Sequence, residues 1–261
     1  MTLSVIKIGG NIIDDPTKLA SFLGTFTAIA DPKILVHGGG KVATDIGRQL
    51  GIEPKYADGR RITDAATLHV VTMVYGGLIN KQITAQLQAL RCNAIGLTGA
   101  DASIIPAQKR PVKDIDFGYV GDVASKDINT EVLRIMLDAG LTPVLAPLTH
   151  DGNGQMLNTN ADTIAQEVAK ALAVLYDVQL IYCFEKKGVL ADPANEDSVI
   201  SKINAGAFER LKASGIIFGG MIPKLENALA AINSGVERVV IGNADELAAI
   251  VEGKAGTCIT Q

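Results

Sequence analysis

Short apolar runs alternate with longer segments of helical period along the whole chain. The runs are rich in β-branched residues, and six of them predict strands, at 3–8, 33–36, 93–98, 141–146, 178–184 and 237–242. The segments between them predict helices over 16–30, 40–50, 64–90, 129–139, 161–173, 204–214, 222–234 and 244–252. Strands that alternate with helices are typical of an α/β protein whose mainly parallel sheet is covered by helices.

The alternation is interrupted once, between residues 100 and 127. This segment is polar and rich in turn-forming residues, and it indicates a hairpin insertion rather than a linker. A softer division falls near residue 175, after a predicted helix. We therefore expect an N-terminal lobe over 1–175 and a C-terminal lobe over 176–261 that share one sheet.

Composition narrows the class of protein. The chain has 261 residues, of which 48% are hydrophobic and 20% charged, so a globular fold with a substantial core is expected. Its 24 basic and 28 acidic side chains include no basic run, which argues against a nucleic-acid partner. Without a signal peptide or a membrane-length apolar run, we expect a cytoplasmic protein that binds no membrane. The three cysteines are far apart, and we interpret them as reduced structural residues.

Three consecutive glycines in "VHGGGK" (36–41) raise the question of a phosphate-binding loop. A Walker A loop needs a glycine five residues before Gly40 and a hydroxyl residue after Lys41, and the chain has neither. The glycine spacing also fits the G-x-G-x-x-[GA] pattern of dinucleotide-binding proteins. However, the segment 51–61, where the confirming acidic strand end would fall, contains no convincing strand. Neither a P-loop nor a dehydrogenase is favoured.

A second glycine pair, Gly9 and Gly10, ends the first predicted strand, which also contains Lys7. A lysine within an apolar strand either meets an anion or lies on an edge strand from which its ammonium group reaches water. Both glycine clusters follow predicted parallel strands, and ligands bind beyond the carboxyl ends of such strands. The bare N–H groups of this pair and of Gly39 and Gly40 could together hold one transferring phosphoryl group.

Two further segments offer polar side chains. The segment 57–63, "ADGRRIT", contains two adjacent arginines, and a guanidinium group can grip a carboxylate through two hydrogen bonds. Asn158, Asn160 and Asp162 stand at alternate positions just before a predicted helix, where one of them could serve as the N-cap. One cap does not require three polar residues, so ligand binding is also considered.

Lys224 lies near the start of another predicted helix, where a cation is disfavoured unless it serves a ligand. Taken together, the segments supply glycine, lysine and amide groups. This set favours phosphoryl transfer, in which catalysis depends mainly on positioning and on neutralisation of charge.

The segments "KIGGN", "VHGGGK", "DGRRITD", "LNTNAD" and "GGMIPK", in this order and at these separations, resemble the amino acid kinase family. The resemblance covers essentially the whole chain. It implies a three-layer αβα sandwich with an open, mainly parallel sheet of about eight strands, with an acyl-amino-acid in the N-terminal lobe and ATP in the C-terminal lobe.

Within this family, the motifs are most similar to those of members that phosphorylate the γ-carboxylate of N-acetyl-L-glutamate with MgATP in the second step of arginine biosynthesis. Carbamate kinase, glutamate 5-kinase, UMP kinase and aspartokinase share the glycine loops. The combination of "DGRRIT" with "LNTNAD" favours an acylated glutamate over their substrates.

The resemblance also implies roles for single residues. Lys7 would stabilise the transferring phosphoryl group, Lys224 the leaving ADP, and Asp162 would orient both lysines. Substrate binding would fall to Gly39, Gly40, Arg61, Asn158 and Asn160, with Arg61 on the α-carboxylate and Asn158 on the acylated amino group. Phosphate and nucleotide binding would fall to Gly9, Gly10, Glu185, Gly188, Leu190, Phe218 and Gly219. Mg²⁺ would be held chiefly by the nucleotide phosphates, so no protein ligand to metal is assigned, and His37 is interpreted as structural.

One segment departs from the family pattern. Where members have L-[ST]-D-V-x-G-[VI]-L, this chain has "LIYCFEKKGVL" (180–190), with Glu185 in place of the aspartate and two lysines after it. The contacts to adenine and ribose therefore stay open, and the lysines are equally consistent with a solvated loop.

The start of the chain bears on its oligomeric state. The chain begins at its first predicted strand, without the extra N-terminal helix of hexameric, arginine-inhibited relatives, so we expect a homodimer that arginine does not inhibit. The helix over 64–90 is the candidate interface.

N-succinyl-L-glutamate is an alternative substrate if the insertion at 100–127 enlarges the acyl pocket. A catalytically silent amino-acid or nucleotide sensor is a second alternative, against which the intact Lys7, Asp162 and Lys224 argue.

Overall fold

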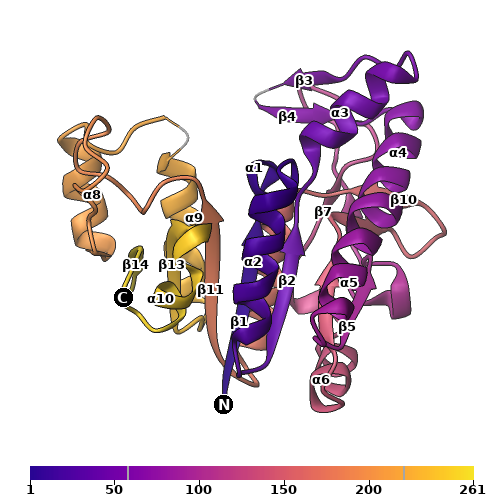
Figure 1. Ribbon diagram of the computed structural model, residues 1–261. Coiled ribbons are helices and arrows are strands. Elements are labelled where there is room, and N and C mark those ends of the chain that lie inside the picture. Colours follow the sequence, from indigo (N-terminus) through magenta and orange to yellow (C-terminus); the bar gives the residue numbers. More distant parts are fainter. Residues whose placement is uncertain (58, 220) are drawn as a thin grey trace.

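An eight-stranded sheet forms the centre of the protein (Figure 1). The computed structural model describes residues 1–57, 59–219 and 221–261, so Asp58 of "DGRRITD" and Gly220 of "GGMIPK" lie outside the described residues. The strand order is β12-β14-β13-β11-β1-β2-β8-β5, and neighbours run parallel except β13 and β14. The strands are β1 (Thr2–Ile8), β2 (Lys33–His37), β5 (Ala94–Leu97), β8 (Thr142–Leu145), β11 (Asp177–Phe184), β12 (Lys202–Ile203), β13 (Arg238–Asn243) and β14 (Thr257–Ile259).

All six strands predicted from the sequence lie in this sheet, and the expected α/β class with a mainly parallel sheet of about eight strands is confirmed. Strands β12 and β14, which complete it, span two and three residues. Runs this short carry no recognisable period.

Helices cover both faces of the sheet (Figure 1). They are α1 (Gly10–Ile13), α2 (Pro16–Ala28), α3 (Gly40–Gln49), α4 (Ala65–Val71), α5 (Asn80–Ala89), α6 (Thr130–Asp138), α7 (Ala161–Leu172), α8 (Ala205–Ala213), α9 (Met221–Asn233) and α10 (Leu247–Val251). Side-chain caps explain several starts: backbone N–H groups of the first turn donate to Asp15 at α2, Asn129 at α6, Asn160 at α7 and Asn204 at α8. Short 3₁₀ turns are η2 (Asp101–Ser103), η3 (Ser125–Asp127) and η4 (Ala244–Glu246).

The helix predicted over 64–90 has the expected extent but a different character in its middle. Helices α4 and α5 are joined by a π-helical segment, η1 (Thr72–Ile79). This segment contains two adjacent glycines, Gly76 and Gly77, and a π turn inside a helix often marks a functional site.

Three small antiparallel hairpins stand apart from the main sheet. They pair β3 (Lys55–Ala57) with β4 (Arg60–Ile62), β6 (Gln108–Lys109) with β7 (Gly121–Asp122), and β9 (Leu148–His150) with β10 (Met156–Asn158). The second hairpin confirms the insertion predicted between 100 and 127.

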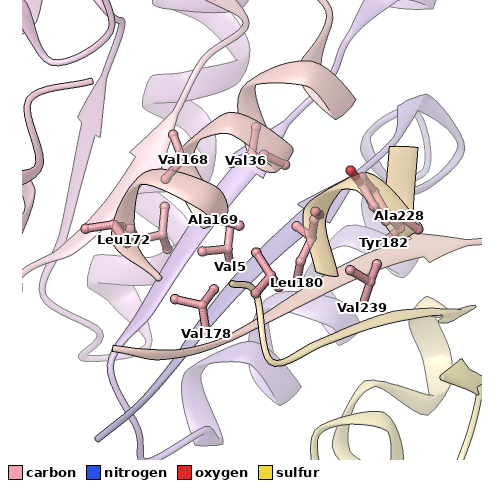
Figure 2. Close-up of a cluster of buried hydrophobic side chains, with 14 of the residues drawn as sticks. Val5, Val36, Val168, Ala169, Leu172, Val178, Leu180, Tyr182, Ala228 and Val239 are labelled. Carbon is pink, nitrogen blue, oxygen red and sulfur yellow. The ribbon is translucent and has the colours of Figure 1, made fainter. Parts of the chain in front are cut away.

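The core is divided by the sheet into two layers of apolar side chains. Along β1, Leu3 and Val5 point to one layer and Ile6 and Ile8 to the other, because successive side chains of a strand alternate between faces. Figure 2 shows the first layer, where side chains of α7 and α9 pack against β1, β2, β11 and β13. This alternation places Lys7 on the face that α7 covers.

Two smaller observations concern membrane contact and cysteine chemistry. In the described part of the chain, no helix is long and apolar enough to cross a membrane. Cys92, Cys183 and Cys258 are free thiols, and the first two are buried.

Replacement of a side chain in the sheet centre tests this packing. Leu180 of β11 is fully buried, so Leu180→Ala is expected to lower the free energy of unfolding by about 2–5 kcal/mol, since it leaves a cavity between sheet and helix. Val174→Ala is the control, because Val174 is 79% exposed and its loss is expected to change stability by less than about 0.5 kcal/mol. Urea denaturation of both variants measures the difference, and equal effects would contradict the assigned core.

Candidate active site

The two glycine turns follow β1 and β2, which are neighbours in the sheet. The backbone N–H of Gly38 donates to the carbonyl of Ile8 over 3.0 Å. A Cβ placed on Gly38 would lie only 3.8 Å from the Cα of Gly9. The turns at Gly9–Gly10 and Gly38–Gly40 therefore lie side by side at the carboxyl edge of the sheet.

Backbone N–H groups of these turns remain without acceptors. Among the residues that the structure describes, the N–H groups of Gly9, Gly10, Gly39 and Gly40 donate to no other group. Gly40 is also the first residue of α3, a helix of ten residues whose dipole adds positive potential at its N-terminus. The two turns together can receive an anion with several oxygen atoms.

Lys7 lies next to these turns and pairs with an acidic side chain of α7. Its Nζ is 2.7 Å from Oδ1 of Asp162, and the two side chains are 10% and 35% exposed. The alternative explanation for Lys7, an edge strand, is wrong, because β1 lies between β11 and β2 in the interior of the sheet. Burial of the ammonium group is thus compensated by a carboxylate rather than by water.

The start of α7 holds Asp162 in place. Asn160 is the N-cap, and its Oδ1 accepts hydrogen bonds from the N–H groups of Asp162 (2.7 Å) and Thr163 (3.2 Å). The hydroxyl of Tyr182, from β11, donates to the carbonyl of Asp162 over 3.3 Å. The capping interpretation is therefore correct for Asn160, and the cap leaves the Asp162 carboxylate free to face Lys7.

Lys224 approaches the same place from the first turn of α9. Its Nζ lies 3.9 Å from the centre of the Phe184 ring, and that of Lys7 lies 5.5 Å from the same centre. Burial lowers the pKa of the Lys224 ammonium group below its ordinary value; the carboxylate of Asp162 opposes this shift, and the charge of Lys7 adds to it. The face of one aromatic ring thus holds two cations close to one carboxylate.

Lys224 and Asp162 share a small cavity without forming an ion pair. The cavity is lined by Asp162, Tyr182, Phe184, Lys224, Asn227 and Ile241. Within the described residues, no acidic oxygen lies within 4.0 Å of the Lys224 Nζ. The ammonium group therefore stays available for a negatively charged ligand.

Arg61 extends from the β3–β4 hairpin to the start of α3. Its Nη2 donates to the carbonyl of Gly40 (2.8 Å) and to the hydroxyl of Thr44 (2.9 Å), and the guanidinium group stacks on the ring of Tyr56. Its Nε and Nη1 donate to no group in the described part of the chain. Arg61 is thus fixed beside the second glycine turn with donors left for a carboxylate.

Asn158 connects the remaining predicted segments. Its Nδ2 donates to the hydroxyl of Thr63 over 3.0 Å, which joins "LNTNAD" to "DGRRITD". The insertion packs against both residues: the N–H of Tyr119 donates to the Thr63 carbonyl (2.7 Å), and the Asn158 N–H donates to the Tyr119 carbonyl (2.9 Å). The insertion therefore forms part of the wall around Asn158.

Three residues of the atypical segment, Glu185, Gly188 and Leu190, lie outside the lining of the Lys224 cavity. Glu185 is exposed and lines a different cavity, on the side of Asn11, Lys18 and Asp245. Gly188 is buried, and a Cβ there would lie 2.6 Å from the Thr257 hydroxyl. Leu190 pairs with Val199. The structure thus places Gly188 against β14, whereas Tyr182 and Phe184 at the start of the same segment line the cavity of Lys224.

The two lysines in this segment form surface ion pairs. Lys186 contacts Glu196 and Lys187 contacts Asp197, each over 2.6 Å. All four side chains are well exposed, which agrees with the interpretation of a solvated loop.

Phe218 and Gly219 precede α9. The Phe218 side chain is 63% exposed, and Gly219 has a φ of +54°. Both residues lie shortly before α9, the helix that contains Lys224.

Sequence reasoning missed several residues that shape the site. Phe184 is the main one, because both lysine ammonium groups lie near the face of its ring. The only signal in the sequence was its position at the end of a predicted strand. Tyr182, Thr44 and Thr63 were also missed, since each acts through hydrogen bonds that no local pattern reveals.

Comparison with known proteins agrees with this geometry. The model of the amino acid kinase family matches residues 2–243. The chain is 59% identical to an acetylglutamate kinase of Cytophaga hutchinsonii over 250 residues, covering 95% of this chain and 94% of that protein. It is 57% identical to an acetylglutamate kinase of Bacteroides thetaiotaomicron, with 98% of each chain covered.

A solved structure is similar as well. The Streptococcus mutans UA159 protein smu.665 superposes with a TM-score of 0.78 at 30% identity, over 99% of this chain and 98% of that one. Sequence and structure both match over almost the full length, and the chain therefore belongs to the amino acid kinase family.

Proposed function

We propose that this protein transfers the γ-phosphoryl group of ATP to the γ-carboxylate of N-acetyl-L-glutamate, the second step of arginine biosynthesis. The observation that carries the proposal is the buried pair of Lys7 and Asp162 beside two turns with free N–H groups, in a chain whose relatives are named acetylglutamate kinases. A cytoplasmic location and the division into lobes 1–175 and 176–261 belong to the same proposal.

The reaction needs no general base, because the substrate carboxylate is itself the nucleophile. One of its oxygens attacks the γ-phosphorus while the bond from that phosphorus to the bridging oxygen of ADP breaks. Lys7 and the N–H groups of Gly10, Gly39 and Gly40 stabilise the charge on the transferring group, and Lys224 stabilises the charge that develops on ADP. Asp162 keeps Lys7 directed at the reacting atoms.

The substrate is placed by groups at the second turn. The free donors of Arg61 hold the α-carboxylate, and Asn158 holds the acylated amino group next to the insertion. Asn160 contributes through its cap, which fixes the start of α7. The γ-carboxylate then reaches the N–H groups of Gly39 and Gly40.

The nucleotide lies over the cavity of Lys224. Gly9 and Gly10 face its γ-phosphate, and exposed Phe218 with Gly219 offers an apolar face for the base. Glu185, Gly188 and Leu190 contact the nucleotide only if their loop moves from its position against β14. Among the described side chains, no cluster of three His, Cys, Asp or Glu residues could hold a metal ion. Mg²⁺ would be held chiefly by the phosphates of the nucleotide, whose charge it would neutralise.

N-succinyl-L-glutamate is a second candidate substrate, favoured by one observation. The Lys109 Nζ lies 5.1 Å from the centre of the Tyr119 ring, in the part of the insertion that borders Asn158. A succinyl group would bring a second carboxylate to this region, and Lys109 could pair with it.

Comparison of the two substrates tests the proposal. We expect kcat/KM for N-acetyl-L-glutamate to exceed that for the succinyl compound by about tenfold or more, because the relatives are named acetylglutamate kinases. An exposed pair with Lys109 would return at most about 1 kcal/mol to the succinyl compound. ADP release in a coupled assay gives both values. Equal or better use of the succinyl compound, together with its selective loss in Lys109→Met, would overturn the acetyl assignment. Absence of ADP release with both substrates would favour the alternative of a catalytically silent sensor.

We also propose a homodimer formed through the α4–η1–α5 segment. Met73 and Leu78 of η1 are 55% and 40% exposed, and large apolar side chains on a helix surface are typical of protein interfaces.

Light scattering tests the dimer. The expected mass is about twice the 27.3 kDa of one chain. Met73→Glu is expected to shift the protein towards the monomer, because it would bury a charge in the interface. Ile135→Glu, at an exposed position of α6, is the control and should leave the mass unchanged. A monomeric wild type, or a hexamer, would contradict the proposal.

A further inference from the structure

His37 is buried at the end of β2, immediately before the second glycine turn, and takes no part in the chemistry proposed above. Its Nδ1 lies 2.7 Å from the carbonyl oxygen of Gly38, and its Nε2 lies 3.2 Å from Nδ2 of Asn80. Asn80 is fully buried too and begins α5, directly after η1. Two buried polar side chains thus form a chain of hydrogen bonds that ends on the turn.

The partners of His37 determine which ring nitrogen carries the proton. A carbonyl oxygen can only accept, so Nδ1 must donate to Gly38. Burial lowers the pKa of His37 to about 4, so the ring is neutral near pH 7 and its Nε2 accepts. The group that Asn80 presents to Nε2 must then be its NH₂.

A second acceptor fixes Asn80 in the same orientation. Its Nδ2 also donates to the carbonyl of Val144 in β8 over 2.9 Å. Its Oδ1 faces Gly96 of β5, where a Cβ would overlap it, and finds no hydrogen-bond partner among the described residues. The orientation of the Asn80 amide therefore satisfies both N–H donors of its NH₂ group and leaves its Oδ1 without a donor.

The hydrogen bond to Gly38 sets the direction of the next N–H group. In a planar trans peptide, the carbonyl of Gly38 and the N–H of Gly39 point in opposite directions. The carbonyl points inward to His37, so the Gly39 N–H points outward to the site. Gly39 has a φ of +145°, and a Cβ there would overlap the side chain of Ile79, the last residue of η1.

We propose that Asn80 and His37 are positioning residues: Asn80 keeps the proton of His37 on Nδ1, and the resulting hydrogen bond to Gly38 directs the Gly39 N–H at the reacting carboxylate and phosphoryl group. This inference rests on the proposed function for the identity of the group that receives the N–H. The arrangement of the hydrogen bonds does not depend on it.

Two substitutions of His37 separate positioning from packing. Asparagine places its amide nitrogen where Nδ1 stands and keeps the donor to Gly38, whereas glutamine places its amide near Nε2 and keeps only the contact to Asn80. We expect kcat of His37→Gln to fall by about 10–100-fold with KM for ATP within about twofold, and His37→Asn to retain kcat within about fivefold of wild type. Equal losses in both variants, or wild-type kcat in both, would overturn the proposal.

Nitrogen-15 NMR of the imidazole rings tests the same arrangement without activity. The chain has three histidines, so single substitutions of His69 and His150 assign the signal of His37. We expect the proton on Nδ1 alone in the wild type and on both ring nitrogens in Asn80→Asp, because an ionised carboxylate at Nε2 only accepts while the Gly38 carbonyl still accepts from Nδ1. A proton on Nε2 of the wild type would overturn the proposal. A wild type that is inactive on acylated glutamate but shows the Nδ1 proton would instead refute the proposed function and leave this arrangement standing.

Discussion

The ion pair between Lys7 and Asp162 is the interaction on which the rest of the site depends. Burial of an ammonium group in the interior of a parallel sheet is unfavourable unless a carboxylate compensates its charge. Removal of either partner would leave the other charge buried without compensation. Alternation along β1 turns Lys7 towards α7, and the Asn160 cap holds the first turn of α7 so that Asp162 meets it. A strand, a helix start and one cap are thus coupled through a single contact.

The parallel topology explains why the remaining groups converge. Strands β1, β2 and β11 are neighbours and end at one edge, so the two glycine turns and Phe184 meet there although they are far apart in the sequence. Positive charge from Lys7 and Lys224 and the free N–H groups are in place before any ligand arrives. A site preorganised in this way suits a reaction in which negative charge moves between oxygens of two anions.

Much of this could be predicted from the sequence, because the signals were local. The period of the apolar runs gave the strands, and the lysine within an apolar strand and the glycines after it indicated the site. What could not be predicted depends on tertiary packing. The interior place of β1 follows from pairing with β11, which begins 176 residues after Met1. The π-helical segment η1 and the burial of Asn80 look like ordinary helix in the sequence, and the position of Glu185 away from Lys224 follows from the packing of Gly188 on β14.

The most direct test of this account is the turnover number of Asp162→Asn on ATP and N-acetyl-L-glutamate, with nucleotide affinity measured by calorimetry. The variant keeps the shape of the side chain and removes its charge. The account predicts a kcat lower by about 10²–10³-fold and a dissociation constant for ATP within about threefold of wild type. Asp177→Asn, whose 66% exposed side chain contacts the N-terminus, should behave as wild type. A folded Asp162→Asn variant with kcat within twofold of wild type would contradict the account.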